Sequence, residues 1–431
     1  MQPYDAVVQK ARVRARIGTQ ATEEQHTEAE HRSAFSQPGF RRYFPSTCLS
    51  TLGSWIIRFL FGWAAWELTA SAFWVGSIAG LMLVPTFLLT PIFGITADRI
   101  NPRNGLLVTI SLMGLLAALA AIIATLGYLE LPALAVLALA FGALTSAHTP
   151  IRLAFLPRLV ERGALPSAIG YSAIIFNSSR IIGPAVGAWL LVVSSVPAAF
   201  AVSAVICIGA VALLTRVTGT EREATTEERG SFAKQLRAGF VYLRRDSMLR
   251  QVFLLTLASG MLGRTVIELL PAVSGRVLGG DSATLATLTA AAGAGSILGG
   301  LLVSRQSGRL RRLYHLVLFG LTLSAMTVLT AAFWQDVWVV AVAIALIAGC
   351  TTTIGTGCQA LTQLTVAESY RGRVMSLWAV VAMGTPAIGA VLVGSVADAA
   401  GFPLAFAGTA LFALVIVLVL RSPAPSQSVG S

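Results

Sequence analysis

Charged residues are scarce in this sequence, and their scarcity excludes most classes of protein. Only 12% of the 431 residues are charged, whereas 55% are hydrophobic and the mean hydropathy is +0.77. A typical soluble domain carries roughly 25% charged residues. A soluble chain of this length could not hide so much apolar surface in its core. The composition excludes a soluble enzyme, a nucleic-acid-binding domain and a disordered chain, and it indicates a polytopic membrane protein.

Cysteine and lysine are also scarce. The four cysteines (Cys48, Cys207, Cys350 and Cys358) lie in or beside apolar runs without the spacing of metal ligands. They predict small buried residues rather than a disulfide framework, and we expect neither a metal nor a cofactor. Lysine accounts for two of the 31 basic residues, Lys10 and Lys234, and the net charge is +12. Such a charge is typical either of a nucleic-acid-binding surface or of one side of a membrane protein.

Apolar runs long enough to cross a bilayer are abundant. A span needs about 20 apolar residues, and the sequence predicts twelve such spans, separated by short polar turns. Their approximate ranges are 45–68, 74–97, 105–127, 132–150, 167–192, 197–215, 249–272, 284–303, 313–333, 337–360, 374–397 and 403–420.

The basic residues fall on one side of these spans. If both termini are cytoplasmic, 27 of the 31 lie in tails and loops of that side, including Arg152 after span four. One, Arg276, lies on the opposite side, and Arg58, Arg180 and Arg264 lie inside spans. Because cytoplasmic loops carry an excess of basic residues, both termini are predicted to be cytoplasmic. This distribution explains the charge, so no nucleic-acid partner is expected.

The spans divide into two sets of six. We expect a cytoplasmic tail over 1–43, a six-helix bundle over 44–215, a linker over 216–248, a second bundle over 249–420 and a tail over 421–431. The tail at 1–43 is polar and lacks the apolar core of a secretory signal. Within the linker, Phe232, Leu236, Phe240 and Leu243 recur at three- and four-residue spacing, which predicts an amphipathic helix on the membrane face.

An internal repeat relates the two sets. Residues 206 apart match in register, so that Arg58, Gly94, Arg99 and Arg103 correspond to Arg264, Gly300, Arg305 and Arg309. At an offset of 202, the stretch 184–188 corresponds to 386–390. Matches across three helix pairs predict two pseudo-symmetric six-helix bundles around a central site, which work by alternating access.

The loop after span two carries a recognisable motif. Residues 94–103 read GITADRINPR, which resembles the signature G-x-x-x-D-[RK]-x-G-[RK]-[RK] of the major facilitator superfamily. Asn101 stands where the second glycine is usual, and asparagine also tolerates a left-handed backbone. The resemblance implies a cytoplasmic gate formed by Gly94, Asp98, Arg99 and Arg103, in which Asp98 caps a neighbouring helix or pairs with an arginine. The second copy has Ser304 at the aspartate position, so its latch should be weaker.

Span five carries a second motif. Gly170, Ser179, Gly183, Pro184 and Gly187 follow the pattern G-x8-G-x3-G-P-x2-G-G, with Ser179 and Ala188 replacing two glycines. This pattern resembles the motif of antiporters in the same superfamily. Small residues at this spacing allow two helix backbones to approach closely, and Pro184 bends the helix. Generic packing of small residues remains the alternative.

The wider chain, over roughly 38–420, is similar to the branch of transmembrane secretion effectors. The similarity rests on stretches such as Phe40–Tyr43, Pro150–Val160, Phe176–Gly187 and Arg371–Ser376. It implies an all-α membrane protein of the major facilitator fold, in the inner membrane of a bacterium. Span four, however, lacks the intramembrane arginine of resembling drug antiporters, so coupling by that route is in doubt.

Ionisable residues inside spans are expensive and are functional candidates by default. Arg58 and Arg264 occupy matched positions, and Glu268 lies four residues after Arg264, on the same helix face. An Arg264–Glu268 pair is therefore expected, either to bind a proton or a substrate carboxylate in alternation or to rigidify span seven. In span five, Arg180 lies close to Asn177. It would either neutralise an anionic substrate or hold a helix contact.

Span ten is rich in small polar groups. Thr352 and Gln359 would line the central site, although threonine hydroxyls also bond to their own helix. No nucleoside-triphosphate motif G-x4-G-K-[ST] and no catalytic constellation is present. We therefore expect not an enzyme but a proton-coupled exporter (an antiporter) of a small molecule such as a drug, siderophore or metabolite, acting as a monomer. The alternatives are an uptake or uniport facilitator and a transport-inactive scaffold or sensor.

Overall fold

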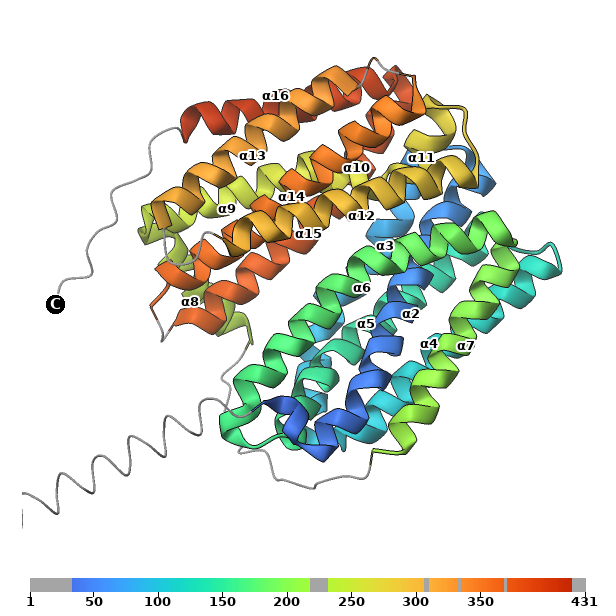
Figure 1. Ribbon diagram of the computed structural model, residues 1–431, viewed down its shortest axis with the longest axis vertical. Coiled ribbons are helices and arrows are strands. Elements are labelled where there is room, and N and C mark those ends of the chain that lie inside the picture. The colour runs from blue at the N-terminus through green and yellow to red at the C-terminus, as the bar shows by residue number, and fades with distance from the viewer. Residues whose placement is uncertain are drawn as a thin grey trace, which may run out of the picture.

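The computed structural model describes residues 33–217, 232–305, 310–331, 333, 335–367 and 370–420. The remaining parts of the expected tails and linker (1–32, 218–231 and 421–431) lie outside these ranges. The described residues form helices joined by short turns, and they contain no strand. This architecture confirms the all-α prediction (Figure 1).

The first half of the chain contains six long helices. A short 3-10 turn at Ala34–Ser36 precedes them, and another at Arg162–Ala164 separates the fourth from the fifth. The helices are α2 (Pro38–Thr69), α3 (Ala72–Arg99), α4 (Pro102–Thr125), α5 (Leu131–Leu159), α6 (Leu165–Val193) and α7 (Val196–Thr215).

The second half begins with a broken span. Its segments are α9 (Ser247–Ser259), a π-helical turn (Gly260–Arg264), α10 (Thr265–Glu268), α11 (Leu270–Ala272) and a second π-helical turn (Val273–Val277). The axis bends by 52° between Glu268 and Leu270. Five long helices follow: α12 (Ser282–Ser304), α13 (Leu310–Ala331), α14 (Val337–Thr365), α15 (Arg371–Ala400) and α16 (Phe402–Val419).

Length and composition make these helices membrane spans. Eleven of the described helices are long and apolar enough to cross a bilayer, and the broken pair supplies a twelfth. In α4, for example, Ile110 and Met113 are buried while Leu115 and Leu119 are exposed. A helix that is apolar on both faces packs against its neighbours with one face and meets lipid with the other. The twelve-span prediction is therefore confirmed.

Several helices extend beyond the predicted spans. The largest difference is in α5, which was expected to end near residue 150 but continues to Leu159 with Pro150 and Pro157 inside it. Arg152 therefore lies on a helix rather than in a loop, and its assignment to loop 4–5 was wrong. Hydropathy could not reveal this extension because Arg152 and the two prolines interrupt the apolar run.

The helices form two bundles that meet along two helix pairs. Figure 1 shows α2–α7 below and α9–α16 above. The bundles contact each other mainly through α3 with α15 and α6 with α12. We call the end where α2 begins and α16 ends the tail side, and the opposite end the far side. A residue near one end of a span therefore lies on the side where that end of the span is found.

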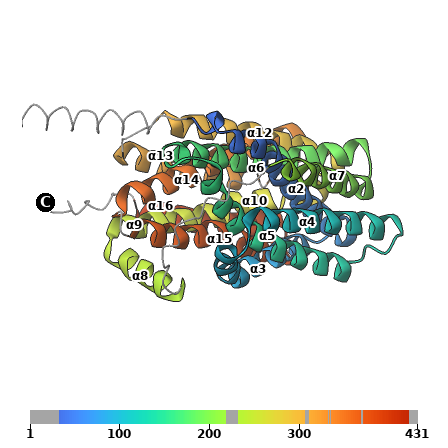
Figure 2. The same ribbon diagram turned by 90° about the horizontal axis from the view of Figure 1, so that it is seen from below.

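The amphipathic linker helix forms as α8 (Phe232–Arg245). It packs across the start of α15, where Tyr242 stacks on Tyr370 with ring centroids 4.5 Å apart. The Tyr242 hydroxyl also accepts a hydrogen bond of 3.3 Å from the Ala367 amide. Figure 2 shows α8 at the edge of the molecule, beside the second bundle. The helix thus extends the second bundle on the tail side.

Candidate functional site

An ion pair joins the two bundles within the spans, nearer to the far-side ends of α2 and the broken span than to their tail-side ends. Arg58 on α2 donates a hydrogen bond from Nη2 to Oε1 of Glu268 on α10, at 3.3 Å. The two side chains are 25% and 21% exposed. Removing one partner of a partly buried ion pair leaves the other charge in a less well solvated place, which costs free energy. This pair therefore links the bundles and depends on the charge of both groups.

The hydrogen-bonded partner of Glu268 is Arg58 and not Arg264, the partner expected from the sequence. Glu268 is the last residue of α10, directly before the 52° bend. At this position its carboxylate reaches across to α2 instead of along its own helix. Arg264 ends the π-helical turn and stays within electrostatic range of both Glu268 and Arg58. The site thus contains two guanidinium groups and one carboxylate.

A row of aromatic and basic side chains leads from Arg58 toward the tail side. The Arg58 guanidinium lies 5.8 Å from the Trp55 ring, and the Trp55 ring packs edge-on to Phe176 at 5.7 Å. Phe176 in turn lies 5.9 Å from the Arg152 guanidinium. Arg152 also donates a 2.9 Å hydrogen bond to the Ser172 hydroxyl. We call Arg58, Trp55, Phe176 and Arg152 the arginine–aromatic row.

Asn177 and Arg180 share a polar strip on α6. Asn177 is exposed and donates to the Ala173 carbonyl, while Arg180 is half-buried one turn further on. A separate strip of the same helix exposes Ile174, Ile182 and Trp189. The place of Asn177 and Arg180 on a transport pathway stays a prediction. The sequence predicted both residues but not their common strip.

Thr352 and Gln359 are partly exposed on α14, on a face that also exposes Thr356. Thr351, Thr353 and Thr362 of the same helix are buried. Thr353 is buried and donates to the Gly349 and Gly299 carbonyls, and Thr362 donates to the Cys358 carbonyl. Bonding of threonine hydroxyls to the backbone therefore applies to Thr353 and Thr362, and the lining of the central site by Thr352 and Gln359 stays a prediction.

The glycine motif of span five packs α6 against α2. A Cβ on Gly183 would lie 2.5 Å from the Trp55 Cβ, and one on Gly187 would lie 2.7 Å from the Phe59 ring. Ser179 is buried on this face, and Pro184 lies inside the helix. Gly170 differs, because a Cβ there would meet no atom within 4 Å. Gly183 and Gly187 thus hold the helix that carries Arg58.

Of the expected gate motif, the structure describes the side chain of Arg103. The helix α3 runs through Arg99, but the side chains of Gly94, Asp98 and Arg99 lie outside the described residues. Arg103 donates from Nη2 to the Thr215 carbonyl at 2.8 Å, within its own bundle. Asn101 has φ −69° and caps α4 through its side chain. The left-handed backbone considered for Asn101 was therefore wrong, because the residue acts as an extended N-cap.

A cluster around Asp398 joins the bundles on the far side. Its carboxylate pairs with Arg276 and accepts a 2.5 Å hydrogen bond from the Ser71 hydroxyl. It also accepts from the amides of Ala72 and Phe73, the first residues of α3, at 3.1 and 3.0 Å. One carboxylate of α15 therefore caps a helix of the other bundle. We call this cluster the far-side clasp, and the sequence did not predict it.

Backbone contacts reinforce the far-side clasp. A Cβ on Gly76 would overlap the Ala390 carbonyl, and one on Gly394 would overlap the Ala72 carbonyl. On the tail side, a Cβ on Gly170 of α6 or Gly300 of α12 would meet no atom within 4 Å. The bundles are thus in close contact at the far side.

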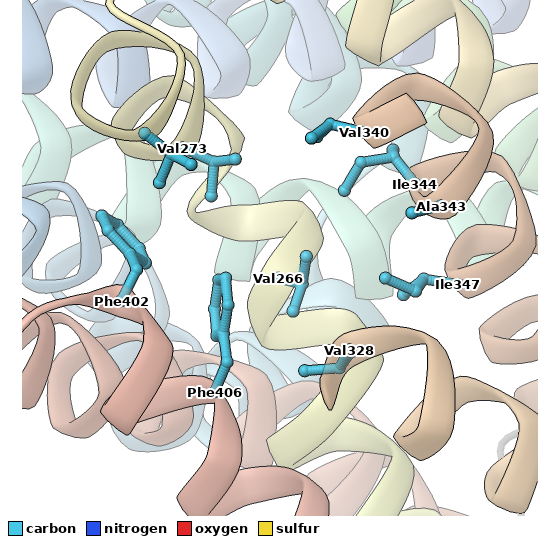
Figure 3. Close-up of a pocket in the computed structure, with 10 residues that line it drawn as sticks. Val266, Val273, Val328, Val340, Ala343, Ile344, Ile347, Phe402 and Phe406 are labelled. Carbon is cyan, nitrogen blue, oxygen red and sulfur yellow. The ribbon is translucent and has the colours of Figure 1, made fainter. Parts of the chain in front are cut away.

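A small pocket of about 30 Å³ lies inside the second bundle, beside the bend (Figure 3). Phe402 and Phe406 of α16 face Val266 of α10 across it. Its lining is apolar throughout and comes from α10, the second π-helical turn, α13, α14 and α16. Neither Arg58 nor Glu268 lines this pocket, so it is separate from the Arg58–Glu268 site.

Comparison with known proteins shows the family to which the chain belongs. A family model described as transmembrane secretion effector matches residues 30–429. The chain belongs to this family of major facilitator transporters. It is 26% identical over 388 residues to the Staphyloferrin A transporter of Staphylococcus aureus, covering 88% of this chain and 94% of that protein. It is 25% identical over 360 residues to Macrolide efflux protein A of Streptococcus pyogenes, covering 81% and 88%.

Solved structures show the same fold. A bacterial homologue of the human lysosomal transporter Spinster, in an inward-facing and unoccupied conformation, superposes with a TM-score of 0.69 at 13% identity, covering 90% of this chain and 99% of that chain. The nucleoside transporter NupG gives a TM-score of 0.67 at 11% identity, covering 88% and 98%. With these relatives, the apolar spans identify an integral membrane transporter of the bacterial inner membrane.

Proposed function

We propose that this family member is a secondary active exporter of a small organic molecule, energised by the proton gradient. The observation that carries the proposal is the ion pair between Arg58 and Glu268, which joins the two bundles within the spans. A proton on Glu268 would remove one charge of this pair and weaken the link. Protonation is thereby coupled to the relative movement of the bundles, as alternating access requires.

The direction and orientation are part of the same proposal. The excess of basic residues supports a cytoplasmic tail side, and with that orientation the closed far-side clasp favours an inward-facing conformation. Export is favoured by the macrolide efflux relative and by the antiporter-like glycine motif of α6. The proposed unit is a monomer of two bundles, with boundaries at 44–215 and 249–420.

A deletion strain tests this function. Loss of the gene should raise the intracellular level of the cargo, and untargeted metabolomics would detect the increase. A protonophore should cause the same increase in the parent strain. An increase that appears in the deletion strain but not with the protonophore would contradict proton coupling, and no increase in either would contradict export.

Complementation assigns the proton step to one residue. Wild-type protein should restore the low intracellular level, whereas Glu268→Gln, which cannot ionise, should fail although it folds and inserts. Glu130→Gln is the matched control, because Glu130 is exposed before α5 and its side chain caps nothing. Equal export by Glu268→Gln and wild type would refute the proposed role of Glu268.

A further inference from the structure

The charges at the centre of the transporter do not balance. Arg58 and Arg264 lie near Glu268, the carboxylate that acts on Arg264 in the described structure. The other acids of the described spans and turns lie in loops, at caps or within the last three residues of a helix. Two guanidinium groups and one carboxylate leave one positive charge without a counter-ion. Such a charge is costly in a poorly solvated region.

The arginine–aromatic row prepares two guanidinium groups to receive an anion. A guanidinium that stacks on a ring keeps its in-plane N–H donors available for an acceptor. Each guanidinium has five such donors; the contacts described above use one on Arg58, toward Glu268, and one on Arg152, toward Ser172. Trp55 and Phe176 lie between them and present apolar ring surface.

We propose that the cargo is an organic carboxylate with a flat apolar body. Its carboxylate binds Arg58 and supplies the missing negative charge, while its body lies against Trp55 and Phe176. Arg152, closer to the tail side on α5, attracts the anion as it enters. This assignment rests on the proposed export function, and it names the class of molecule that the same site recognises.

The assignment is compatible with export by exchange. When the cargo occupies Arg58, an ionised Glu268 remains balanced by Arg264, so the loaded site is neutral without a proton. Cargo and proton then need not travel together. The cargo also competes with Glu268 for Arg58, so removing the charge of Glu268 should strengthen binding of the cargo. A purely structural ion pair would not behave in this way.

Three probes that share a naphthyl body and differ in the charge of the head group test the inference. They are 2-naphthoate, 2-naphthamide and (2-naphthylmethyl)trimethylammonium, measured by calorimetry with the full-length protein in lipid nanodiscs. We expect the anion to bind at least about tenfold more tightly than the amide, as a charge-assisted contact provides. Binding of the amide or the cation as tightly as the anion, or no saturable binding of the anion, would overturn the proposal.

Variants locate the contact. Arg58→Gln should weaken naphthoate binding at least about tenfold with little effect on the amide, Arg152→Gln should weaken it less, and Glu268→Gln should strengthen it. Arg41→Gln is the control, because Arg41 is an exposed residue of the same helix. If Arg58→Gln does not fold, Arg58→Lys keeps the charge but loses the planar fork, and it should give an intermediate affinity. Unchanged naphthoate affinity in a folded Arg58 variant would overturn the assignment.

The two proposals fail in different ways. If the metabolite that accumulates in the deletion strain carries no carboxylate, the cargo class is wrong but export stands. If naphthoate binds through Arg58 but no metabolite accumulates, the anion site stands and export is wrong.

Discussion

The two bundles repeat one sequence pattern but build their central helix pair differently. In the first bundle the continuous helix α2 packs on α6, where Gly183 and Gly187 face Trp55 and Phe59. In the second bundle the broken span packs on α15. There Gly389, the counterpart of Gly187, faces Thr265, the counterpart of Phe59. The repeat therefore preserves the contact although it changes the residues that make it.

The position equivalent to Gly183 shows how the contact survives. That position is Thr385 in α15, and the close approach is provided instead by Gly260 on the opposite helix, whose added Cβ would lie 2.8 Å from the Thr385 Cβ. Close packing of two helices requires one small residue at each crossing, on either helix. A sequence repeat can thus lose a glycine and keep the geometry.

The starts of α3 and α12 differ in the same manner. The second helix of the second bundle is capped by its own Asp281, which accepts from the amides of Ala283 and Thr284. The second helix of the first bundle has its first amides bound by Asp398 of the other bundle. The free amides at the start of the helix are satisfied from within the same bundle in the second half. In the first half they are satisfied by a residue of the other bundle, so that the cap links the two bundles. Only the latter arrangement can respond to movement of the bundles.

The largest expected effect comes from filling the first helix crossing. Gly183→Val should lower the free energy of unfolding by about 3 kcal/mol or more, because the new side chain would overlap Trp55 and the backbone at Ile56. Thermal unfolding of the purified protein and its folded yield measure the change. Gly170→Val is the control from the same motif and should have little effect, since that position is open. Equal losses in both variants would show that helix propensity, not the crossing, is responsible.

Breaking the far-side clasp should have the next largest effect. Asp398→Asn removes the charge that binds Arg276 and the start of α3, and it should weaken the contact between the bundles by about 2 kcal/mol. Distances between spin labels on the far-side ends of α3 and α15 should then include a longer, open population. The matched change Asp281→Asn affects a cap within one bundle, and it should leave these distances unchanged. A distance distribution identical to wild type in Asp398→Asn would refute the clasp.

The second helix crossing should be less sensitive than the first and should be rescuable. Gly389→Ala should cost about 1–2 kcal/mol, because its Cβ would overlap the Thr265 hydroxyl. The additional change Thr265→Ala removes that hydroxyl and should recover part of the loss in thermal unfolding. No such rescue is expected for Gly183→Ala with Trp55→Ala, because the obstruction there includes a Cβ and backbone atoms. Failure of the first rescue would show that the obstruction lies elsewhere.

The smallest effect should come from the local cap. Asp281→Ala should cost about 1 kcal/mol of stability, as loss of an N-cap does. Hydrogen bonds from the Thr284 amide first, and then the Ala283 amide, hold the pKa of Asp281 below its ordinary value. Because the folded pKa is depressed, the stabilisation is present above the unfolded pKa of about 3.9 and is lost as the pH falls through the folded value. Stability curves of wild type and Asp281→Ala should therefore converge in acid, and a constant difference down to low pH would contradict this account.

Much of the fold was predictable because a bilayer imposes strong local requirements. The spans followed from apolar length, and the linker helix followed from its spacing of apolar residues. Arg58 and Glu268 were also identified, because an ionisable residue inside a span stands out in an apolar run. Their pairing was not, since spacing along one helix favoured Arg264 and only the bend at Leu269 turns Glu268 toward α2.

The residues that the sequence did not identify share one property. Arg152 and Asp398 lie near helix ends, where charges are common and carry no signal of their own. Their partners, Phe176 and the start of α3, are distant in sequence or belong to the other bundle. The spacing of residues within one helix cannot predict a contact with a residue on another helix.

The sequence by itself determined that this chain is a two-bundle membrane transporter, because hydropathy depends on residues close together in the chain and the repeat is visible when the two halves of the sequence are compared. The tertiary structure decided which charges meet. It paired Arg58 with Glu268, connected Arg152 to that pair through two rings, and placed Asp398 on a helix of the opposite bundle. These contacts join segments as much as 327 residues apart. They exist only once the packing of helices has brought the two bundles together.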